Sequence, residues 1–352
     1  MKIHIMKKSA LPVGILCLVI LLSGCAPKPV RLSYSSVFFA LDTVISVNAY
    51  GDESLEVVSD TENYINSLEN DFSRTLPESL VYKINHSEER VNKVDERLME
   101  ILRLSKKMYD ITDGKFDITI APAADLWGFT KDSFRVPTDE EIENVKSKVG
   151  FDHVHIDDET VVTDEGTGID LGGIAKGYAL ENIKDIFEGH SLDGGLANMG
   201  GDILVYGNGS SGDLWHIGIK DPAVSKKEDD SLGILEIKDR YILTSGGYER
   251  YFEENGRHYS HILNPINCMP AYSDILSVTV VTDLEKGYGT AADALATALF
   301  IMGSKEAEEF WKDNQWFDMI VVDDLGNIYV SEGIKDNFVL IKPKKYNCII
   351  ID

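Results

Sequence analysis

The segment Ile169-Asp-Leu-Gly-Gly-Ile-Ala-Lys-Gly177 joins a glycine pair to the start of a periodic, helix-like stretch that ends near Phe187. Gly172 and Gly173 carry no Cβ, so the backbone at this point can come close to a ligand. The first N–H groups of a helix have no partner within it, and Lys176 adds a positive charge beside them. The segment predicts either a phosphate site or a structural loop, because its spacing matches neither common glycine-rich nucleotide motif.

The first residues of the chain have the pattern of an export signal. Two lysines precede an apolar run, from about Ala10 to Leu22, that is too short for a comfortable membrane span. The run ends in Leu-Ser-Gly-Cys25, which resembles the bacterial lipobox, in which the cysteine is lipidated. We expect residues 1–24 to be a signal peptide and residues 25–36 a lipidated tether that anchors the protein to the extracytoplasmic side of the cell membrane. An ordinary signal peptide with an incidental cysteine is the alternative.

The charge and cysteine counts exclude several classes of protein. The formal charge is −25, and loss of the three lysines of the signal makes it −28, so we expect no binding to nucleic acid. An anionic ligand would need local donors or a metal ion. Besides the lipidated cysteine, the exported chain keeps Cys268 and Cys348, which are too few for a disulfide framework or a metal cluster.

Strand-like and helix-like patterns are interspersed along the rest of the chain without strict βαβ alternation. We therefore predict an α+β fold with antiparallel-rich sheets, as one domain over residues 37–341 followed by a tail at 342–352. Residues 202–207 and 215–219, with a polar turn between them, are typical of a strand–turn–strand unit. The expected helices are 55–72, 98–109, 177–187 and 291–302, and the other expected strands are 42–50, 154–156, 161–162, 234–237, 241–243, 276–281, 319–322 and 328–330.

Asp293 and Thr297 lie four residues apart in a run of alanine and leucine, so a helix would place both on one buried face. A buried carboxylate needs a partner. A carboxylate, a hydroxyl and a backbone carbonyl together suit Mg²⁺. The alternative is an aspartate that accepts hydrogen bonds from the amides of a neighbouring turn.

Aromatic and histidine side chains give further candidates. Phe116 and Trp127 could stack on a planar ring, although aromatic residues at the junction of a helix and a strand more often pack in a core. His261 lies between an expected strand and Asn264-Pro265, a suitable place for an imidazole that accepts a proton near neutral pH. A histidine that only completes local hydrogen bonds is the alternative.

Together and in this order, these motifs resemble the ApbE family of bacterial FAD:protein FMN transferases, which are often exported lipoproteins. The resemblance spans roughly residues 37–335. It implies a mixed α+β fold with FAD and Mg²⁺ bound at the seam between its two halves. The matching motifs are Phe39-Ala-Leu-Asp-Thr43, Phe72-Ser73, Ser79 to Asn85, Gly114-Lys-Phe-Asp-Ile-Thr119, Leu126-Trp-Gly-Phe129, Asp170 to Gly177, Asn198-Met-Gly-Gly201, Thr244-Ser-Gly246, His261-Ile-Leu-Asn-Pro265 and Asp293 to Thr297.

In members of this family the FMN moiety moves from FAD to a threonine of an exported or membrane redox protein, and AMP is released. The resemblance implies that Asp293, Thr297 and the backbone carbonyl of Gly173 bind Mg²⁺, with the backbone at Ala296 beside them. It also implies that His261 is the base that acts on the acceptor hydroxyl. The residues that fall where the family contacts FAD are Leu41, Thr75, Lys115, Phe116, Asp117, Asp170, Lys176 and Ile262.

The sequence departs from the family pattern at three positions. Asp42 stands where glycine is usual, Gly247 where an acidic residue follows the Ser-Gly pair, and Asn264 where aspartate is common. Two other functions are compatible with the motifs: hydrolysis of FAD to FMN and AMP, and binding or delivery of flavin without catalysis. Without the resemblance, a surface-anchored adhesin or solute-binding lipoprotein is a further alternative. A metal pair and a base favour an enzyme, because a carrier needs neither.

Overall fold

The computed structural model describes residues 32–86, 91–92, 94–131, 133–157, 159–209, 213–223 and 230–352. The expected signal peptide, Cys25 and the first part of the expected tether lie outside these residues. Ser33–Asp352 is one compact unit. Over the described ranges, every helix is too short or too polar to cross a membrane.

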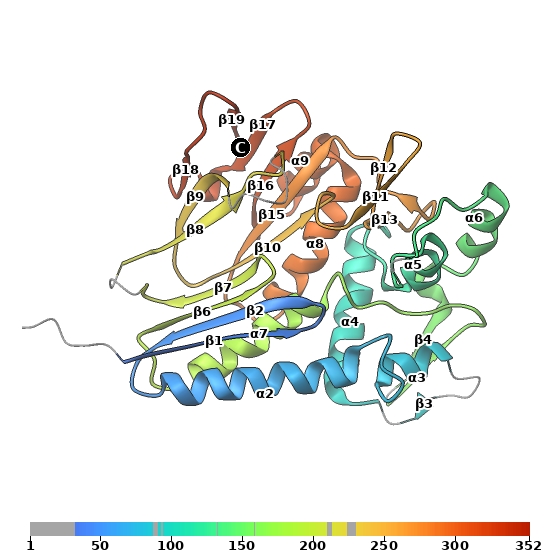
Figure 1. Ribbon diagram of the computed structural model, residues 1–352, viewed down its shortest axis with the longest axis horizontal. Coiled ribbons are helices and arrows are strands. Elements are labelled where there is room, and N and C mark those ends of the chain that lie inside the picture. The colour runs from blue at the N-terminus through green and yellow to red at the C-terminus, as the bar shows by residue number, and fades with distance from the viewer. Residues whose placement is uncertain are drawn as a thin grey trace, which may run out of the picture. The chain divides into compact units, whose positions relative to one another are not determined.

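A nine-stranded sheet runs through this unit, with its strands side by side in the order in which they occur in the chain (Figure 1). Neighbouring strands are antiparallel except the last pair, in which the C-terminal strand runs parallel to its neighbour. The central strands are rich in Val, Ile and Thr, which favour a pleated, buried backbone. In sheet order the strands are β1 (Ser33–Ala40), β2 (Thr43–Tyr50), β6 (Gly194–Met199), β7 (Asp202–Gly207), β10 (Arg240–Gly246), β15 (Ile275–Asp283), β16 (Asp318–Asp323), β17 (Asn327–Ser331) and β19 (Asn347–Ile351).

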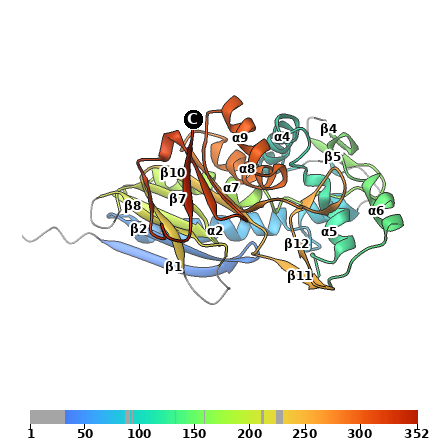
Figure 2. The same cartoon turned by 90° about the horizontal axis from the view of Figure 1, so that it is seen from above.

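Helices cover one face of this sheet and enclose the largest apolar core (Figures 1 and 2). Most of them are amphipathic and present their apolar side to the sheet. The exception is α8, which is apolar on nearly all sides because it packs against β10, β15 and three other helices. These helices are α2 (Ser54–Phe72), α4 (Glu96–Ile111), α7 (Ala175–Glu188), α8 (Tyr288–Met302) and α9 (Ser304–Asp313).

A smaller sheet packs on the opposite face and encloses a second core. It consists of β18 (Phe338–Leu340), β9 (Ser231–Ile237) and β8 (Trp215–Lys220), in that order. Ile217 and Leu235 from this sheet meet Val205 and Val281 from the large one. The unit is therefore layered as helices, large sheet and small sheet.

Short helices and hairpins form a third core around Trp127. This indole is fully buried, and its N–H donates to the Cys268 carbonyl at 2.8 Å, so Trp127 is a core residue. Cys268 and Cys348 are not bridged to each other. The remaining elements are α3 (Leu80–His86), α5 (Ala121–Trp127), α6 (Asp139–Lys146), the 3₁₀ turns Ile118–Ile120, Phe151–His153 and Glu332–Ile334, β3 (Val91–Asn92), β4 (Val154–Asp157), β5 (Thr160–Thr163), β11 (Tyr251–Glu254), β12 (Arg257–Ser260), β13 (Leu263–Asn264) and β14 (Met269–Pro270).

The α+β class and most expected elements are confirmed, but one pairing is wrong. Residues 202–207 and 215–219 are both strands, yet β7 lies in the large sheet and β8 in the small one. The reason is that alternate side chains of both strands, Ile203 and Val205 on β7 and Ile217 and Ile219 on β8, enter the same core. The two strands therefore face each other across that core and do not pair edge to edge.

Both ends of the domain reach further than the sequence suggests. Residues 33–36, which we expected in the tether, form the first half of β1 and pair with β2. Residues 347–351, which we expected in the tail, form β19 and pair with β17. Ile351 is 3% exposed and Tyr346 is 6% exposed, so the last residues contribute to the buried core.

Candidate active site

The segment 169–177 leads into α7 as the sequence predicts, and a second helix caps it. The N-cap residue Ile174 has no side-chain hydrogen bond to offer. Instead, Oδ2 of Asp293, on α8, accepts a hydrogen bond from the Gly177 N–H at 2.8 Å. A carboxylate is stabilised there because it meets unpaired amides at the positive end of a helix dipole.

Two glycines allow this contact. A Cβ on Gly177 would lie 2.3 Å from the Gly289 carbonyl oxygen and 2.7 Å from Cβ of Asp293. Any larger residue would force α7 and α8 apart. The close crossing of the two helices therefore carries the Asp293 carboxylate to the start of α7.

Lys176 and Asp202 complete a buried group of charges with Asp293. The ammonium of Lys176 is ion-paired with Asp202, whose other oxygen accepts from the Thr244 N–H at 2.8 Å. Burial alone would lower the pKa of Lys176, but the carboxylates of Asp202 and Asp293 hold it above its usual range. Burial raises the pKa of Asp293, and the charge of Lys176 opposes this only in part. Asp202, which the sequence offered only as the end of a glycine turn, belongs to the site.

Two hydroxyl groups lie together one helical turn along α8 from Asp293. Thr297 Oγ1 is 3.3 Å from Ser245 Oγ. A Cβ on Gly173 would lie 3.4 Å from both Thr297 Oγ1 and Phe116 Cε2, so these three residues are neighbours. Ala296 is buried on α8 immediately before Thr297.

This donor set fits a hard divalent cation. Among the described residues no three His, Cys, Asp or Glu side chains form a metal cluster. Asp293, Thr297 and nearby backbone carbonyls are all oxygen donors, which Mg²⁺ accepts readily while keeping several waters. The buried carboxylate with a raised pKa also lacks full charge compensation, as expected for a cation site. The amide cap at Gly177 shows that the alternative partner for Asp293 is present as well.

His261 has the tautomer that a general base requires. Its Nδ1 lies 3.0 Å from the Arg250 carbonyl oxygen. A carbonyl only accepts, so Nδ1 carries the hydrogen and Nε2 keeps its lone pair. Burial lowers the pKa of His261 to about 4 despite this hydrogen bond, and the charges of Arg250 and Lys176 lower it further while Asp170 opposes them. The expectation of an imidazole that takes up a proton near neutral pH is therefore wrong for this environment.

Three predicted flavin contacts follow one another after α4. Phe116 is 4% exposed and donates its N–H to Thr112 Oγ1 at 3.1 Å. Lys115 Nζ is 2.8 Å from Glu306 Oε1 on α9. Asp117 caps the next turn by accepting from the Thr119 N–H at 2.8 Å, and burial raises the pKa of Asp117 to about 6. Of these residues, Phe116 lies against the Gly173–Thr297 pair.

Leu41 lies at the tip of the β1–β2 hairpin. Leu41 and Asp42 have φ of 50° and 55°, so the turn needs two left-handed residues. Aspartate tolerates this conformation better than most side chains, which explains how it replaces the usual glycine. Thr43 packs against Gly200, where a Cβ would lie 2.1 Å from Thr43 Oγ1. The tip therefore adjoins the β6–β7 turn that leads to Asp202.

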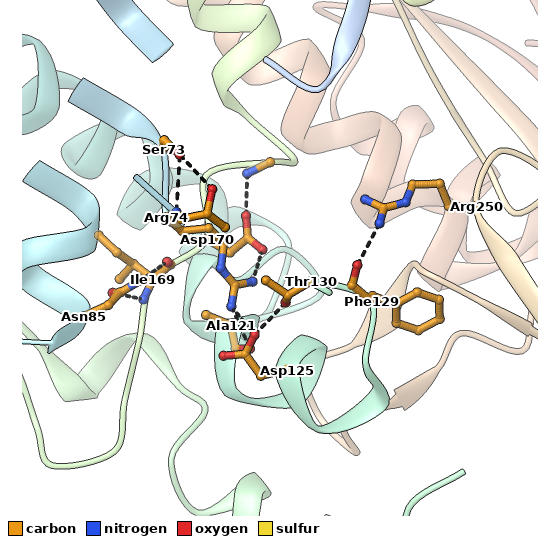
Figure 3. A network of polar contacts seen from close by, with 12 residues as sticks. Ser73, Arg74, Asn85, Ala121, Asp125, Phe129, Thr130, Ile169, Asp170 and Arg250 are labelled. Carbon is orange, nitrogen blue, oxygen red and sulfur yellow. Dashed lines mark hydrogen bonds and ion pairs between the residues drawn. The ribbon is translucent and has the colours of Figure 1, made fainter. Parts of the chain in front are cut away.

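A polar cleft of about 340 Å³ lies next to the start of the 169–177 segment, because residues 166–168 line it. Thr75 lines it, together with Arg74, Tyr82, Asn85, His86, Ala121, Pro122, Asp125, Thr130, Lys131 and residues 166–168. Asp170 reaches the same region through an ion pair with Arg74 (Figure 3). Ile262 is buried, and its carbonyl accepts from the Ala271 N–H at 2.8 Å. A second hollow of about 550 Å³, beside β8, contains none of the predicted residues.

The fold and this group of side chains define an α+β domain with a candidate ligand site where a helix start, a lysine and oxygen donors converge. The chain belongs to the ApbE family, whose model matches residues 41–321. It is 32% identical over 247 residues to the FAD:protein FMN transferase of Vibrio cholerae, covering 69% of this chain and 72% of that one. The enzyme of the same name from Treponema pallidum is 29% identical over 259 residues, covering 69% of this chain and 70% of that one.

Solved structures have the same fold. The crystal structure of the ApbE protein from Thermotoga maritima superposes with a TM-score of 0.78 at 34% identity, covering 87% of this chain and 99% of that chain. The flavin transferase ApbE from Vibrio cholerae superposes with a TM-score of 0.76 at 24% identity, over 87% of this chain and 99% of that chain, and supports the fold alone.

Proposed function

We propose that this protein transfers the FMN part of FAD to a threonine hydroxyl of an exported or membrane redox protein, with Mg²⁺ bound, and releases AMP. Relatives that carry the name FAD:protein FMN transferase support the transfer itself. The observation that carries the proposal is the meeting of Lys176, Asp293 and the Gly173–Thr297 pair at the start of α7. In so acidic a protein, this is a place where a pyrophosphate can meet the positive charge of Lys176.

Each residue has a role in the reaction. The acceptor oxygen attacks the phosphorus of the FMN phosphate, and the bond from that phosphorus to the oxygen of AMP breaks. His261 takes the hydroxyl proton at Nε2, which its low pKa keeps unprotonated at neutral pH. Lys176 stabilises the negative charge that develops on the phosphate oxygens.

Asp293, Thr297 and the carbonyls of Gly173 and Ala296 would hold Mg²⁺. When bound, the ion supplies charge neutralisation at the pyrophosphate. The residues that would contact the flavin nucleotide are Leu41, Thr75, Lys115, Phe116, Asp117, Asp170 and Ile262.

Intact-mass measurement tests the proposal. The form lacking residues 1–25 is mixed with FAD, Mg²⁺ and a threonine-bearing acceptor domain, and we expect the acceptor to gain the mass of one FMN. The gain should vanish with EDTA, or when the acceptor threonine is replaced by alanine. Free FMN and AMP without a mass gain would indicate hydrolysis, and bound FAD with neither product would indicate a flavin carrier.

We also propose that Cys25 carries a lipid that anchors the protein outside the cytoplasm. The support is the Leu-Ser-Gly-Cys pattern after a short apolar run. The full chain should sediment with membranes, and Cys25→Ser should release it. A Cys25→Ser protein that still sediments with membranes would contradict the lipid anchor.

A further inference from the structure

Arg74 bridges two acidic side chains at the edge of the polar cleft (Figure 3). Its Nη1 donates to Asp170 Oδ2 at 2.6 Å, and its Nη2 donates to Asp125 Oδ1 at 2.7 Å. The Arg74 side chain is 15% exposed, against 25% for Asp170 and 56% for Asp125. A planar guanidinium can hold two carboxylates at once in this way, whereas an ammonium is a single point charge.

The backbone that carries Arg74 is itself fixed. Ser73 ends α2, and its Oγ accepts from the N–H groups of Thr75 and Leu76, both at 3.2 Å. Ser79 Oγ donates in turn to the Ser73 carbonyl. The guanidinium therefore extends from a rigid turn, so its position is not set by the carboxylates alone.

Asp170 connects Arg74 to the loop that enters the site. Its Oδ1 accepts from the Gly172 N–H at 2.8 Å, while its Oδ2 accepts from Arg74. Its own N–H donates to the Ile118 carbonyl at 2.7 Å. One carboxylate thus ties the loop at Gly172 to Arg74, and the next residue along, Gly173, is the neighbour of Thr297.

We propose that Arg74 is a positioning residue for flavin transfer, which holds Asp170 so that the loop at Gly172 and Gly173 keeps its place beside Thr297. The inference rests on the proposed function. Without Arg74, the carboxylates of Asp125 and Asp170 would repel each other, and Asp170 could turn away from the Gly172 amide. A displacement of about 1 Å at a reacting centre can lower a rate about 100-fold.

The first experiment compares Arg74→Ala with Arg97→Ala in the form lacking residues 1–25. Arg97 is a matched control, since it also binds two carboxylates, Asp71 and Asp95, but it joins α2 to α4 away from the cleft. We expect Arg74→Ala to lower kcat/KM for FAD by about 10- to 100-fold, and Arg97→Ala to stay within about twofold of the unchanged protein. An Arg74→Ala protein that is folded and fully active would overturn the inference. Absence of transfer by the unchanged protein would instead contradict the proposed function.

A double-mutant cycle tests whether Arg74 acts through Asp170. If it does, Arg74→Ala combined with Asp170→Asn should lower kcat/KM no further than the more damaging single change. If the double variant instead lost kcat/KM by the product of the two single fold-changes, Arg74 would act independently of Asp170. That result would overturn the inference.

Hydrogen exchange gives a readout without catalysis. In the flavin-free protein, the peptide covering residues 169–176 should exchange faster in Arg74→Ala than in Arg97→Ala, because the Gly172 amide loses a fixed partner. If Arg74→Ala does not fold, Arg74→Lys serves in its place, since lysine keeps the charge but cannot bridge Asp125 and Asp170 together. Unchanged exchange and unchanged kcat/KM in the lysine variant would contradict the positioning role.

Discussion

Asp221 and Asp293 are both buried carboxylates, but they differ in the partners that compensate their charge. Asp221 is 1% exposed and accepts from Lys342 and Lys345, each at 2.8 Å, and from the Tyr346 hydroxyl. Asp293 is 4% exposed and accepts from a backbone amide, while the lysine near it is ion-paired with Asp202.

The pKa values of the two groups reflect this difference. Burial alone would raise the pKa of Asp221, but hydrogen bonds from Lys342, Lys345 and Tyr346 hold it well below its usual range. Burial raises the pKa of Asp293, because Lys176 compensates only part of its charge. Burial by itself therefore does not identify a functional carboxylate. A carboxylate whose charge is fully matched stabilises the fold, whereas one left under-compensated is suited to bind a cation.

The largest effect is expected from Asp293→Asn. The amide oxygen can still accept from the Gly177 N–H, so the unfolding free energy should change by no more than about 1 kcal/mol. The loss of charge at the proposed cation site should lower the transfer rate about 1,000-fold, measured by acceptor mass against time. Normal turnover by a folded Asp293→Asn protein would show that Asp293, like Asp221, is not needed for activity. The proposed difference between the two carboxylates would then be wrong.

His261 belongs to the same candidate site as Asp293. We expect His261→Gln to lower the transfer rate about 100-fold, a smaller loss than that from Asp293→Asn. Since the base must be unprotonated and its pKa is about 4, kcat/KM should be level at neutral pH and fall only as the pH drops towards about 4. FAD affinity, measured by flavin fluorescence, should change little. If kcat/KM instead fell around the ordinary pKa of histidine, about 6.5, the buried environment of His261 would be contradicted.

Asp221→Asn should show the reverse pattern, with stability reduced and activity kept. Lys342 and Lys345 would lose their shared partner, and because both are partly exposed we expect a loss of about 2 kcal/mol in unfolding free energy. Transfer per folded molecule should be unchanged. Denaturant titration measures the first quantity and initial rates the second.

The pH dependence of this loss has a defined sign. A carboxyl whose pKa is lowered by folding contributes its full stability above its unfolded pKa of about 3.9, and loses it as the pH falls towards the folded value. The difference between the unchanged protein and Asp221→Asn should therefore be full at neutral pH and shrink below about pH 4. A difference that grows in acid would contradict the pairing.

The smallest effect is expected from Lys345→Ala. Its side chain is 44% exposed, so solvent screens its ion pair with Asp221. We expect a loss of about 0.5 kcal/mol that decreases further in high salt. Loss of as much stability as in Asp221→Asn would show that Lys345, and not the set of three partners, neutralises this carboxylate.

Local patterns in the sequence predicted the elements well. The period of apolar residues located α2, α4 and α8, and the expected hairpins at 154–162 and 319–330 are antiparallel pairs. Pairing between distant strands was harder to predict from the sequence. Strands such as β7 and β8 have the same alternation of apolar residues whether they pair edge to edge or face each other across a core. The parallel pairing of β19 likewise depends on neighbours that adjacent residues do not reveal.

Candidate site residues could be chosen from the sequence, but the contacts between them could not. The spacing of Asp293 and Thr297 on one helix face indicated that they act together. No sequence pattern indicated that Gly177 and Gly289 allow two helices to touch, or that Asp202 pairs with Lys176. Arg74 was also missed, because its two partners lie 51 and 96 residues further along the chain.

The order of strands in the large sheet has a consequence for folding during synthesis. Because the nine strands of the large sheet lie side by side in chain order, each new strand of that sheet pairs with one that has already emerged. A chain that emerges N-terminus first can therefore add each new strand to the outer edge of the sheet already formed. No strand has to be inserted later between two others. The last step brings β19 onto β17 and Lys342 and Lys345 onto Asp221, so a truncated chain would leave both a bare edge and an unmatched buried charge.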